Sequence, residues 1–235
     1  MTGTLYLGTS GFAYPEWKGV FYPPETKGEE MLPFYASRFR SVEVNYTFRR
    51  TPAETTLATW LERTPPGFRF TLKAHQRITH TRRLRDAEEP LGVFLERARR
   101  LGDRLGPTLF QLPPTFEHDP QALEAFLTLL PDDLRFAFEF RHPSWEAARP
   151  VLAERGVAWC VAETDEGPAG AMAWEPFGYL RLRKESYADE ELVVWAERIR
   201  DALAAGRDVH CYLKHEEKGT GPRYAMKLKE LIEGG

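Results

Sequence analysis

The chain has 235 residues, 42% of them hydrophobic and 13% aromatic, which is enough for a sizeable hydrophobic core. Its formal net charge of −3 gives no overall attraction to nucleic acid or to an acidic membrane surface. The first residues lack a basic segment followed by a long apolar run, and no apolar stretch is long enough to span a bilayer. We therefore expect a soluble cytoplasmic protein with no membrane partner.

Eight short segments rich in apolar, β-branched or aromatic residues are predicted to be strands. In chain order they are 5–8, 41–46, 68–74, 108–112, 135–140, 157–162, 178–183 and 208–213. Segments with apolar residues at helical spacing lie between them, at 53–63, 90–101, 120–130, 144–155, 189–205 and 223–232. Residues 163–176 show no convincing helical pattern, so we expect a degenerate helix between the sixth and seventh strands.

Regular alternation of strands and helices predicts a parallel sheet with helices on its outside. Eight such units in 235 residues fit a (β/α)8 TIM barrel, whose typical length is roughly 250 residues. We therefore predict a single TIM-barrel domain over residues 1–235. An open doubly wound sheet is the alternative, but no predicted strand leads into a G-x-G-x-x-G turn.

The predicted strands alternate in polarity, whereas strands buried on both faces are usually continuously apolar. In the fifth strand, Phe136, Phe138 and Phe140 share one face, and Glu139 and Arg141 share the other. Because the helices cover the outside of the barrel, the aromatic face should point outward to meet them. The charged side chains should then point into the barrel.

Inward-facing polar residues near the carboxyl ends of the strands form the candidate site, because TIM barrels place their catalytic residues there. Positive side chains outnumber carboxylates in this set, which favours a small anionic ligand with a phosphate or carboxylate group. As a hypothesis, the protein is an enzyme that acts on a small anionic or phosphorylated substrate. Glu139 or Glu43 is the expected general acid/base. The residues expected to hold the anion are Lys73, Arg141 and Arg181.

Other polar residues complete the candidate substrate-binding set: Asn45, Gln111, His142 and Tyr212. Lys73 is also a candidate catalytic residue, since a lysine inside a barrel can form a Schiff base if its pKa is depressed. The neighbouring arginines would lower this pKa and the two glutamates would raise it. Alternatively, the same charges form a self-neutralising salt-bridge network that only supports the fold.

Four histidines follow predicted strands and raise the question of a metal site: His75, His80, His142 and His215. Lys73, Arg141 and Lys214 lie within two residues of members of this set, and such cations repel a divalent ion. The sequence also lacks H-E-x-x-H or a similarly tight ligand spacing. We therefore predict neither a metal site nor a cofactor.

Two other functions are compatible with a barrel of this kind. The first is a nucleic-acid-binding or phosphodiester-cleaving barrel similar in fold to endonuclease IV. The arginine-rich segment 75–90 and the aromatic segment 12–24 favour it, whereas the net charge and the missing metal ligands oppose it. The second is a non-catalytic ligand-binding scaffold.

Several ordered motifs resemble those of the domain of unknown function 72, or YecE-like, family over nearly the whole chain. They include Gly8-Thr-Ser-Gly-Phe12, Val42-Glu-Val-Asn45, Leu109-Phe-Gln-Leu-Pro-Pro114, Phe138-Glu-Phe-Arg-His142 and Tyr179 with Arg181. The resemblance implies a TIM barrel but brings no known activity.

This chain also departs from the family pattern at two strands. The family usually has His-Gly soon after the strand-seven arginine, where this chain has Leu182-Arg183-Lys184. The family usually has an aromatic-Asn-Asn run at strand eight, where this chain has Tyr212-Leu213-Lys214-His215. These departures suggest a subgroup with a more basic pocket.

Overall fold

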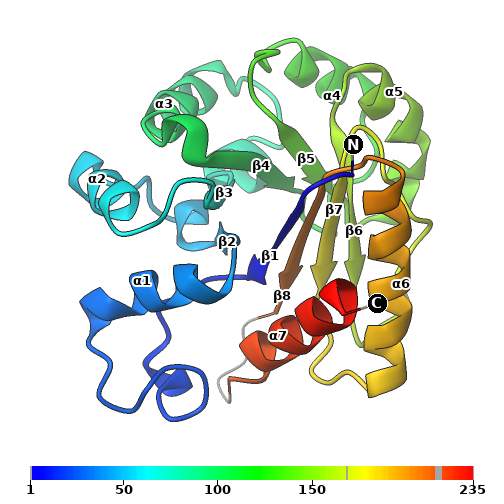
Figure 1. Ribbon diagram of the computed structural model, residues 1–235. Helices are drawn as coiled ribbons and strands as arrows, with labels where there is room; N and C mark the ends of the chain where they lie inside the picture. Colours follow the sequence, from blue (N-terminus) through cyan, green and yellow to red (C-terminus); the bar gives the residue numbers. More distant parts are fainter. Residues whose placement is uncertain (1, 168, 215–218, 235) are drawn as a thin grey trace.

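A computed structural model describes residues 2–167, 169–214 and 219–234 of the chain. Its eight strands form one parallel sheet in the order β1-β8-β7-β6-β5-β4-β3-β2 (Figure 1). The strands are β1 (Leu5–Thr9), β2 (Ser41–Val44), β3 (Arg69–Lys73), β4 (Leu105–Gln111), β5 (Phe136–Glu139), β6 (Ala158–Glu163), β7 (Gly178–Leu182) and β8 (Val209–Leu213). With its surrounding helices, this nearly closed sheet confirms the predicted TIM-barrel fold.

The seam between β1 and β2 is held by a bridge and by a side chain from the first helix. Ser10 and Glu43 form an isolated parallel bridge just beyond β1. A Cβ on Gly8 would lie 2.0 Å from the Ser41 carbonyl oxygen, so only glycine allows this close approach. The buried Tyr35 hydroxyl donates to the same carbonyl at 3.1 Å and accepts from the Thr9 N–H at 2.7 Å. This hydroxyl therefore supplies hydrogen bonds where the two strands do not pair regularly.

The helices are α1 (Gly28–Arg38), α2 (Glu54–Glu62), α3 (Glu88–Arg99), α4 (Pro120–Leu127), α5 (Arg149–Glu154), α6 (Asp189–Ala204) and α7 (Thr220–Glu233). All six predicted helices are present with shifted ends, and α1 was not predicted. The α5 helix begins later than expected because residues Pro143–Ala148 form a 3₁₀ helix. Between β6 and β7, the described residues form no helix, in keeping with the missing helical pattern, so the degenerate helix expected there is absent from them. None of the helices within the described ranges is long and apolar enough to cross a membrane.

The main core lies between the sheet and the helices, as the strand alternation predicted. Phe138 of β5 and Phe110 of β4 pack against Phe126 of α4, with ring centroids 6.1 and 5.1 Å away. Phe110 and Phe138 are both fully buried. Their outward direction leaves the opposite face of each strand to line the barrel interior, where the charged residues lie.

Candidate functional site

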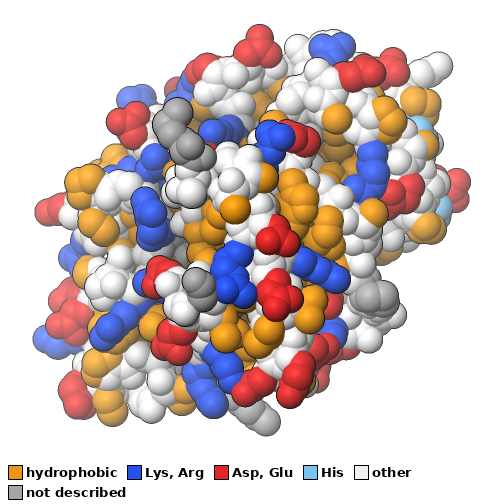
Figure 2. Space-filling model, turned by 45° about the vertical axis from the view of Figure 1, so that its right-hand side comes forward, with side chains coloured by type: hydrophobic (Ala, Val, Ile, Leu, Met, Phe, Trp, Pro, Cys, Tyr) orange, Lys and Arg blue, Asp and Glu red, His pale blue; other side chains and the backbone are white. Residues whose placement is uncertain are grey.

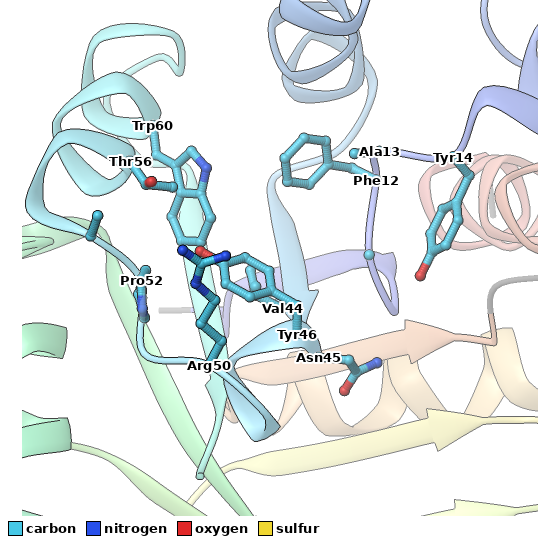
Figure 3. Close-up of a pocket in the computed structure, with 12 residues that line it drawn as sticks. Phe12, Ala13, Tyr14, Val44, Asn45, Tyr46, Arg50, Pro52, Thr56 and Trp60 are labelled. Atoms are coloured by element: carbon cyan, nitrogen blue, oxygen red, sulfur yellow. The ribbon is translucent and has the colours of Figure 1, made fainter.

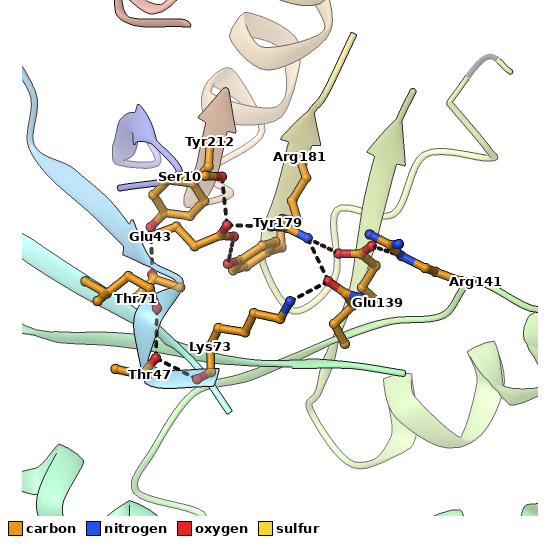
Figure 4. A network of polar contacts seen from close by, with 12 residues as sticks. Ser10, Glu43, Thr47, Thr71, Lys73, Glu139, Arg141, Tyr179, Arg181 and Tyr212 are labelled. Carbon is orange, nitrogen blue, oxygen red and sulfur yellow. Dashed lines mark hydrogen bonds and ion pairs between the residues drawn. The ribbon is translucent and has the colours of Figure 1, made fainter. Parts of the chain in front are cut away.

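Arg181 lies in the centre of the barrel and contacts two carboxylates that come from distant parts of the chain. Its side chain projects from β7 and is 1% exposed. One guanidinium nitrogen, Nη2, donates to Glu43 Oε1 of β2 at 2.7 Å, and Nη1 donates to Glu139 Oε2 of β5. This single side chain therefore links three strands across the barrel (Figure 4).

Both buried carboxylates have further hydrogen-bond donors. Glu43 accepts from the Ser10 hydroxyl at 2.9 Å and from the Tyr179 hydroxyl at 2.7 Å. Glu139 accepts from Arg141 Nε at 3.0 Å. Burial opposes ionisation of both groups, but the charge of Arg181 and these hydrogen bonds outweigh it. The pKa of Glu139 is lowered to about 2, and the pKa of Glu43 is lowered as well.

These lowered pKa values change the expected roles of the two glutamates. A carboxyl group whose pKa is about 2 is ionised at neutral pH, so it has no proton to donate and is a weak base. The geometry therefore does not favour Glu139 or Glu43 as the general acid/base. Both are better described as the anions that hold Arg181 in place.

Lys73 lies at the end of β3 and is half-buried. Its Nζ donates to Gln111 Oε1 at 2.8 Å and lies 4.2 Å from the centre of the Phe48 ring. Within the described part of the chain, it forms no ion pair with a carboxylate. Burial, followed by the charge of Arg181, lowers the pKa of Lys73 to about 8. Among the predicted catalytic residues, Lys73 is thus the one that can exchange a proton near neutral pH.

Arg183 is a further cation near these residues, although it was not among the residues predicted for the candidate site. It follows β7 on the same face as Arg181, and its Nη1 is buried without a hydrogen-bond partner among the described residues. Burial and the charge of Arg181 lower its pKa. We call Glu43, Glu139, Lys73, Arg141, Arg181 and Arg183 the charge network. It contains four cations and two carboxylates.

The other predicted site residues lie at different depths. Gln111 contacts the network directly, because its Oε1 also accepts from Arg181 Nη1 at 3.3 Å. Tyr212 lies deeper in the barrel, with its hydroxyl 2.7 Å from those of both Ser41 and Thr71. Since Tyr212 is fully buried, it supports the base of the site and cannot reach an open mouth.

Asn45 and His142 lie at the rim, and only Asn45 has an unsatisfied atom. Asn45 follows β2, and its Oδ1 is buried without a hydrogen-bond partner among the described residues. The Nδ1 atom of His142 lies 2.8 Å from Ser144 Oγ and accepts from the Ser144 N–H, which caps the following 3₁₀ helix. His142 is therefore engaged locally.

His80 lies nearer to Lys73 than the sequence suggested. It belongs to a π-helix (Arg77–Thr81), a rare conformation that is frequent at functional sites. Its ring packs edge-on against Phe48 at 4.8 Å, the same ring that Lys73 covers. Burial and the nearby charges of Lys73 and Arg141 lower its pKa, which favours a neutral imidazole.

The described ranges contain no group of three His, Cys, Asp or Glu side chains that could hold a metal ion. His215, one of the histidines weighed above, lies outside the described residues.

A cavity of about 540 Å³ lies between the segments that follow β1 and β2. Figure 3 shows aromatic rings on two sides of it, Trp60 and Tyr46 on one and Phe12 and Tyr14 on the other, with the amide of Asn45 next to Tyr46. Its lining residues are Gly11, Phe12, Ala13, Tyr14, Val44, Asn45, Tyr46, Arg50, Pro52, Ala53, Thr56 and Trp60. We call this cavity the aromatic pocket.

Tyr14 connects the aromatic pocket to the charge network. Its hydroxyl donates to the Ser10 carbonyl at 3.0 Å, and the Ser10 hydroxyl donates to Glu43. Burial, together with the charge of Glu43, raises the pKa of Tyr14 to about 12. Gly11 has φ +95°, and a Cβ there would lie 2.4 Å from the Tyr14 hydroxyl. A glycine is therefore required for Tyr14 to fold back over this turn.

Comparison with known proteins identifies the family. The sequence profile of the family described as protein of unknown function DUF72 matches residues 6–234, so the chain belongs to this family. It is 33% identical to the UPF0759 protein YecE of Escherichia coli (strain K12) over 61% of this chain. That match covers 50% of the length of YecE. The chain is 23% identical to the UPF0759 protein YunF of Bacillus subtilis (strain 168), over 97% of this chain and 95% of YunF.

Solved structures support the same fold. A DUF72 family protein from Thermotoga maritima superposes with a TM-score of 0.79 at 25% identity, covering 98% of this chain and 99% of that chain. A DUF72 family protein from Enterococcus faecalis has a TM-score of 0.80 at 17% identity, with coverage of 98% and 96%. SacUVDE has a TM-score of 0.56 at 8% identity, with coverage of 100% and 99%, which is a likeness of fold alone.

The stability of the protein should depend on pH through Glu139. Its pKa falls from the usual 4.5 to about 2 on folding, so the unfolded chain binds more protons between these values. The stabilisation is therefore fully present above pH 4.5 and is lost as the pH falls towards 2. At pH 7, Glu139→Gln should lower the free energy of unfolding by roughly 3–5 kcal/mol, because it leaves Arg181 short of one partner.

Denaturant unfolding between pH 7 and pH 3 measures this effect, and the gap between wild type and Glu139→Gln should narrow as the pH falls. Glu146→Gln is the matched control, because Glu146 forms an exposed pair with Arg149. It should change stability by less than about 1 kcal/mol. A gap that stays constant with pH would contradict the assignment.

Lys73 should titrate near pH 8. Reductive ¹³C-methylation of the lysines, followed by NMR across a pH series, reports each amine separately. Among the lysine resonances, one should move with a midpoint about two pH units below the others, and this resonance should be missing from Lys73→Met. A spectrum in which every amine titrates near its ordinary pKa would show that Lys73 is not perturbed.

Proposed function

We propose that this DUF72 family protein is an enzyme that acts on a small anionic or phosphorylated substrate at the C-terminal face of its barrel. The observation that carries the proposal is the excess of cations in the charge network. Arg181 forms ion pairs with both carboxylates, whereas Lys73 and Arg183 form no ion pair among the described residues. An anion bound at the mouth would be their natural partner.

Partial burial of Lys73 and Arg183 explains why binding an anion would be energetically favourable. A cation that loses water without gaining a partner is destabilised, and this loss is visible in the lowered pKa values of Lys73 and Arg183. Charge-assisted hydrogen bonds from ammonium and guanidinium groups to phosphate or carboxylate oxygens would recover that energy. Arg141, which follows β5 and whose side chain is 41% exposed, would contribute a third contact.

Proton transfer is assigned to Lys73 in place of the two glutamates. An amine whose pKa is about 8 is present in both protonation states near neutral pH, so it can accept a substrate proton or return one. The hydrogen bond to Gln111 fixes the position of Nζ. The Schiff-base route needs the same neutral amine, which would add to a substrate carbonyl carbon with loss of water.

The nucleic-acid alternative is less well supported. In the arginine-rich segment, Arg77 and Arg82 pair with Glu89, and Arg85 pairs with Asp119. In the aromatic segment, Trp17 is fully buried and packs against neighbouring rings, so it is not free to stack on bases. Figure 2 shows acidic and basic side chains interspersed on the face that it presents, which is unlike a basic nucleic-acid footprint.

Binding of inorganic phosphate tests the anion site. Calorimetry at low ionic strength should show that Lys73→Met and Arg183→Met each weaken phosphate binding by roughly tenfold or more, since each removes a charged hydrogen bond. Arg99→Met is the control, because Arg99 pairs with Asp133 on the surface. Wild-type affinity in both variants, or no phosphate binding by the wild type, would contradict the proposal.

A measurement of substrate turnover distinguishes an enzyme from a non-catalytic ligand-binding scaffold. A panel of small phosphorylated and carboxylated compounds would be incubated with wild type and with Lys73→Met. Conversion that depends on Lys73 would support the enzyme. Binding without conversion of any compound would favour the non-catalytic scaffold.

A further inference from the structure

We infer that the aromatic pocket binds a planar aromatic ring of the substrate while the anionic group of the same molecule reaches Lys73 and Arg183. This inference rests on the proposed function and specifies its substrate class, an aromatic or heteroaromatic anion. The position of the pocket, its aromatic walls and its volume support this substrate class.

The pocket and the cations of the charge network are neighbours. Val44 pairs with Leu72 across β2 and β3, so the next residue along β2, Asn45, emerges beside Lys73. The Thr47 hydroxyl, in the segment that carries the pocket wall, donates to the Lys73 carbonyl at 2.7 Å. On the other side, Tyr14 lines the pocket and is influenced electrostatically by Arg183. A ligand can therefore extend from one region into the other.

Aromatic side chains form the wall of the pocket. One face of the Trp60 ring stacks on Phe70 in the core, with centroids 4.9 Å apart and planes 13° apart. Tyr46 meets Trp60 edge-on at 6.0 Å and is 43% exposed, an unusual exposure for a large ring. Phe12 comes from the segment after β1 (Figure 3). Such walls favour stacked or edge-on contact with a planar ring.

The few polar groups in the lining argue against a sugar. Besides the Tyr14 and Tyr46 hydroxyls, the polar side chains of the lining are Asn45, Arg50 and Thr56. A sugar would need partners for many hydroxyl groups, whereas a ring needs few and can also stack on the Arg50 guanidinium. Asn45, whose buried Oδ1 has no hydrogen-bond partner among the described residues, follows Val44 and so lies next to Lys73 in the register of β2 and β3.

The size of the pocket also exceeds what an anion alone requires. Its volume of about 540 Å³ lies within the range of small-molecule sites. A phosphate group held at Lys73 and Arg183 would leave this volume unused. A ring attached to that group would fill part of it.

Three probes test the inference by calorimetry: inorganic phosphate, methyl phosphate and phenyl phosphate. Wild type should bind phenyl phosphate at least tenfold more tightly than methyl phosphate. Ala53→Trp places a large side chain on the pocket lining, so it should abolish this preference and leave the affinity for phosphate unchanged. Ala13→Trp, in the segment after β1, should have the same effect. Agreement between the two variants would show that the lost preference does not come from a folding defect in one of them.

Ala188→Trp is the matched control. Ala53 and Ala188 are both exposed alanines at the start of a helix, with φ/ψ of −67°/154° and −69°/157°, but Ala188 does not line the pocket. This control should keep the wild-type preference for phenyl phosphate.

The outcomes distinguish failure of the proposed ring site from failure of the proposed anion site. Equal affinity for phenyl and methyl phosphate, with phosphate binding intact, would overturn the ring site and leave the anion site standing. Glucose 6-phosphate binding more tightly than phenyl phosphate, and blocked by Ala53→Trp, would overturn the ring as the ligand class. Failure of the wild type to bind any of the phosphates would overturn the proposed function itself.

Discussion

The site depends on one buried guanidinium that must remain bound to two carboxylates from opposite sides of the barrel. Arg181 is 1% exposed, and Glu43 and Glu139 supply the charge that makes its burial possible. Removing either carboxylate would leave an uncompensated charge in a poorly solvated interior. This requirement explains why β2, β5 and β7 carry charged residues on faces that most parallel strands fill with apolar ones.

The same interaction determines which residues remain available for a ligand. Because Glu43 and Glu139 are committed to Arg181, they cannot also neutralise every cation of the network. Among the described residues, Lys73 and Arg183 are left without a carboxylate partner; the pKa of Lys73 is about 8, and Nη1 of Arg183 is buried with no hydrogen-bond partner there. The salt-bridge network and the proposed ligand site, which the sequence presented as alternatives, are therefore compatible with each other.

The fold was predictable because it depends on local patterns. Alternating residues such as Phe136 and Phe138 showed which face of a strand meets the helices, and regular strand–helix spacing indicated the barrel. The α1 helix escaped prediction because it starts at Gly28 and contains Pro33, both of which disfavour a helix. Its buried residues, such as Tyr35, and the hydrogen bond from the Lys27 N–H to the Glu30 carboxylate stabilise it.

The site was predictable only in part, because its pairing depends on closure of the barrel. Alternation indicated that Glu43, Glu139 and Arg181 point inward. It could not show that Arg181 takes both carboxylates, which lie 138 and 42 residues away in the chain. For Arg183 a signal existed, since it lies two residues after Arg181 on the same face. For the aromatic pocket, the aromatic segment 12–24 gave a signal for Phe12 and Tyr14. The other side of the lining, from Val44 to Trp60, could not be assigned to the same pocket before the fold was known.

A crystal structure of the protein soaked in selenate would test whether Lys73 and Arg183 hold an anion beside the paired Arg181, because the anomalous signal of selenium locates the anion without ambiguity. We expect a selenate ion within hydrogen-bond distance of Lys73 Nζ and Arg183 Nη1, with Arg181 still paired to Glu43 and Glu139. A mouth without the ion, in which Lys73 and Arg183 have turned to the two carboxylates, would contradict it and leave the network as a purely structural feature.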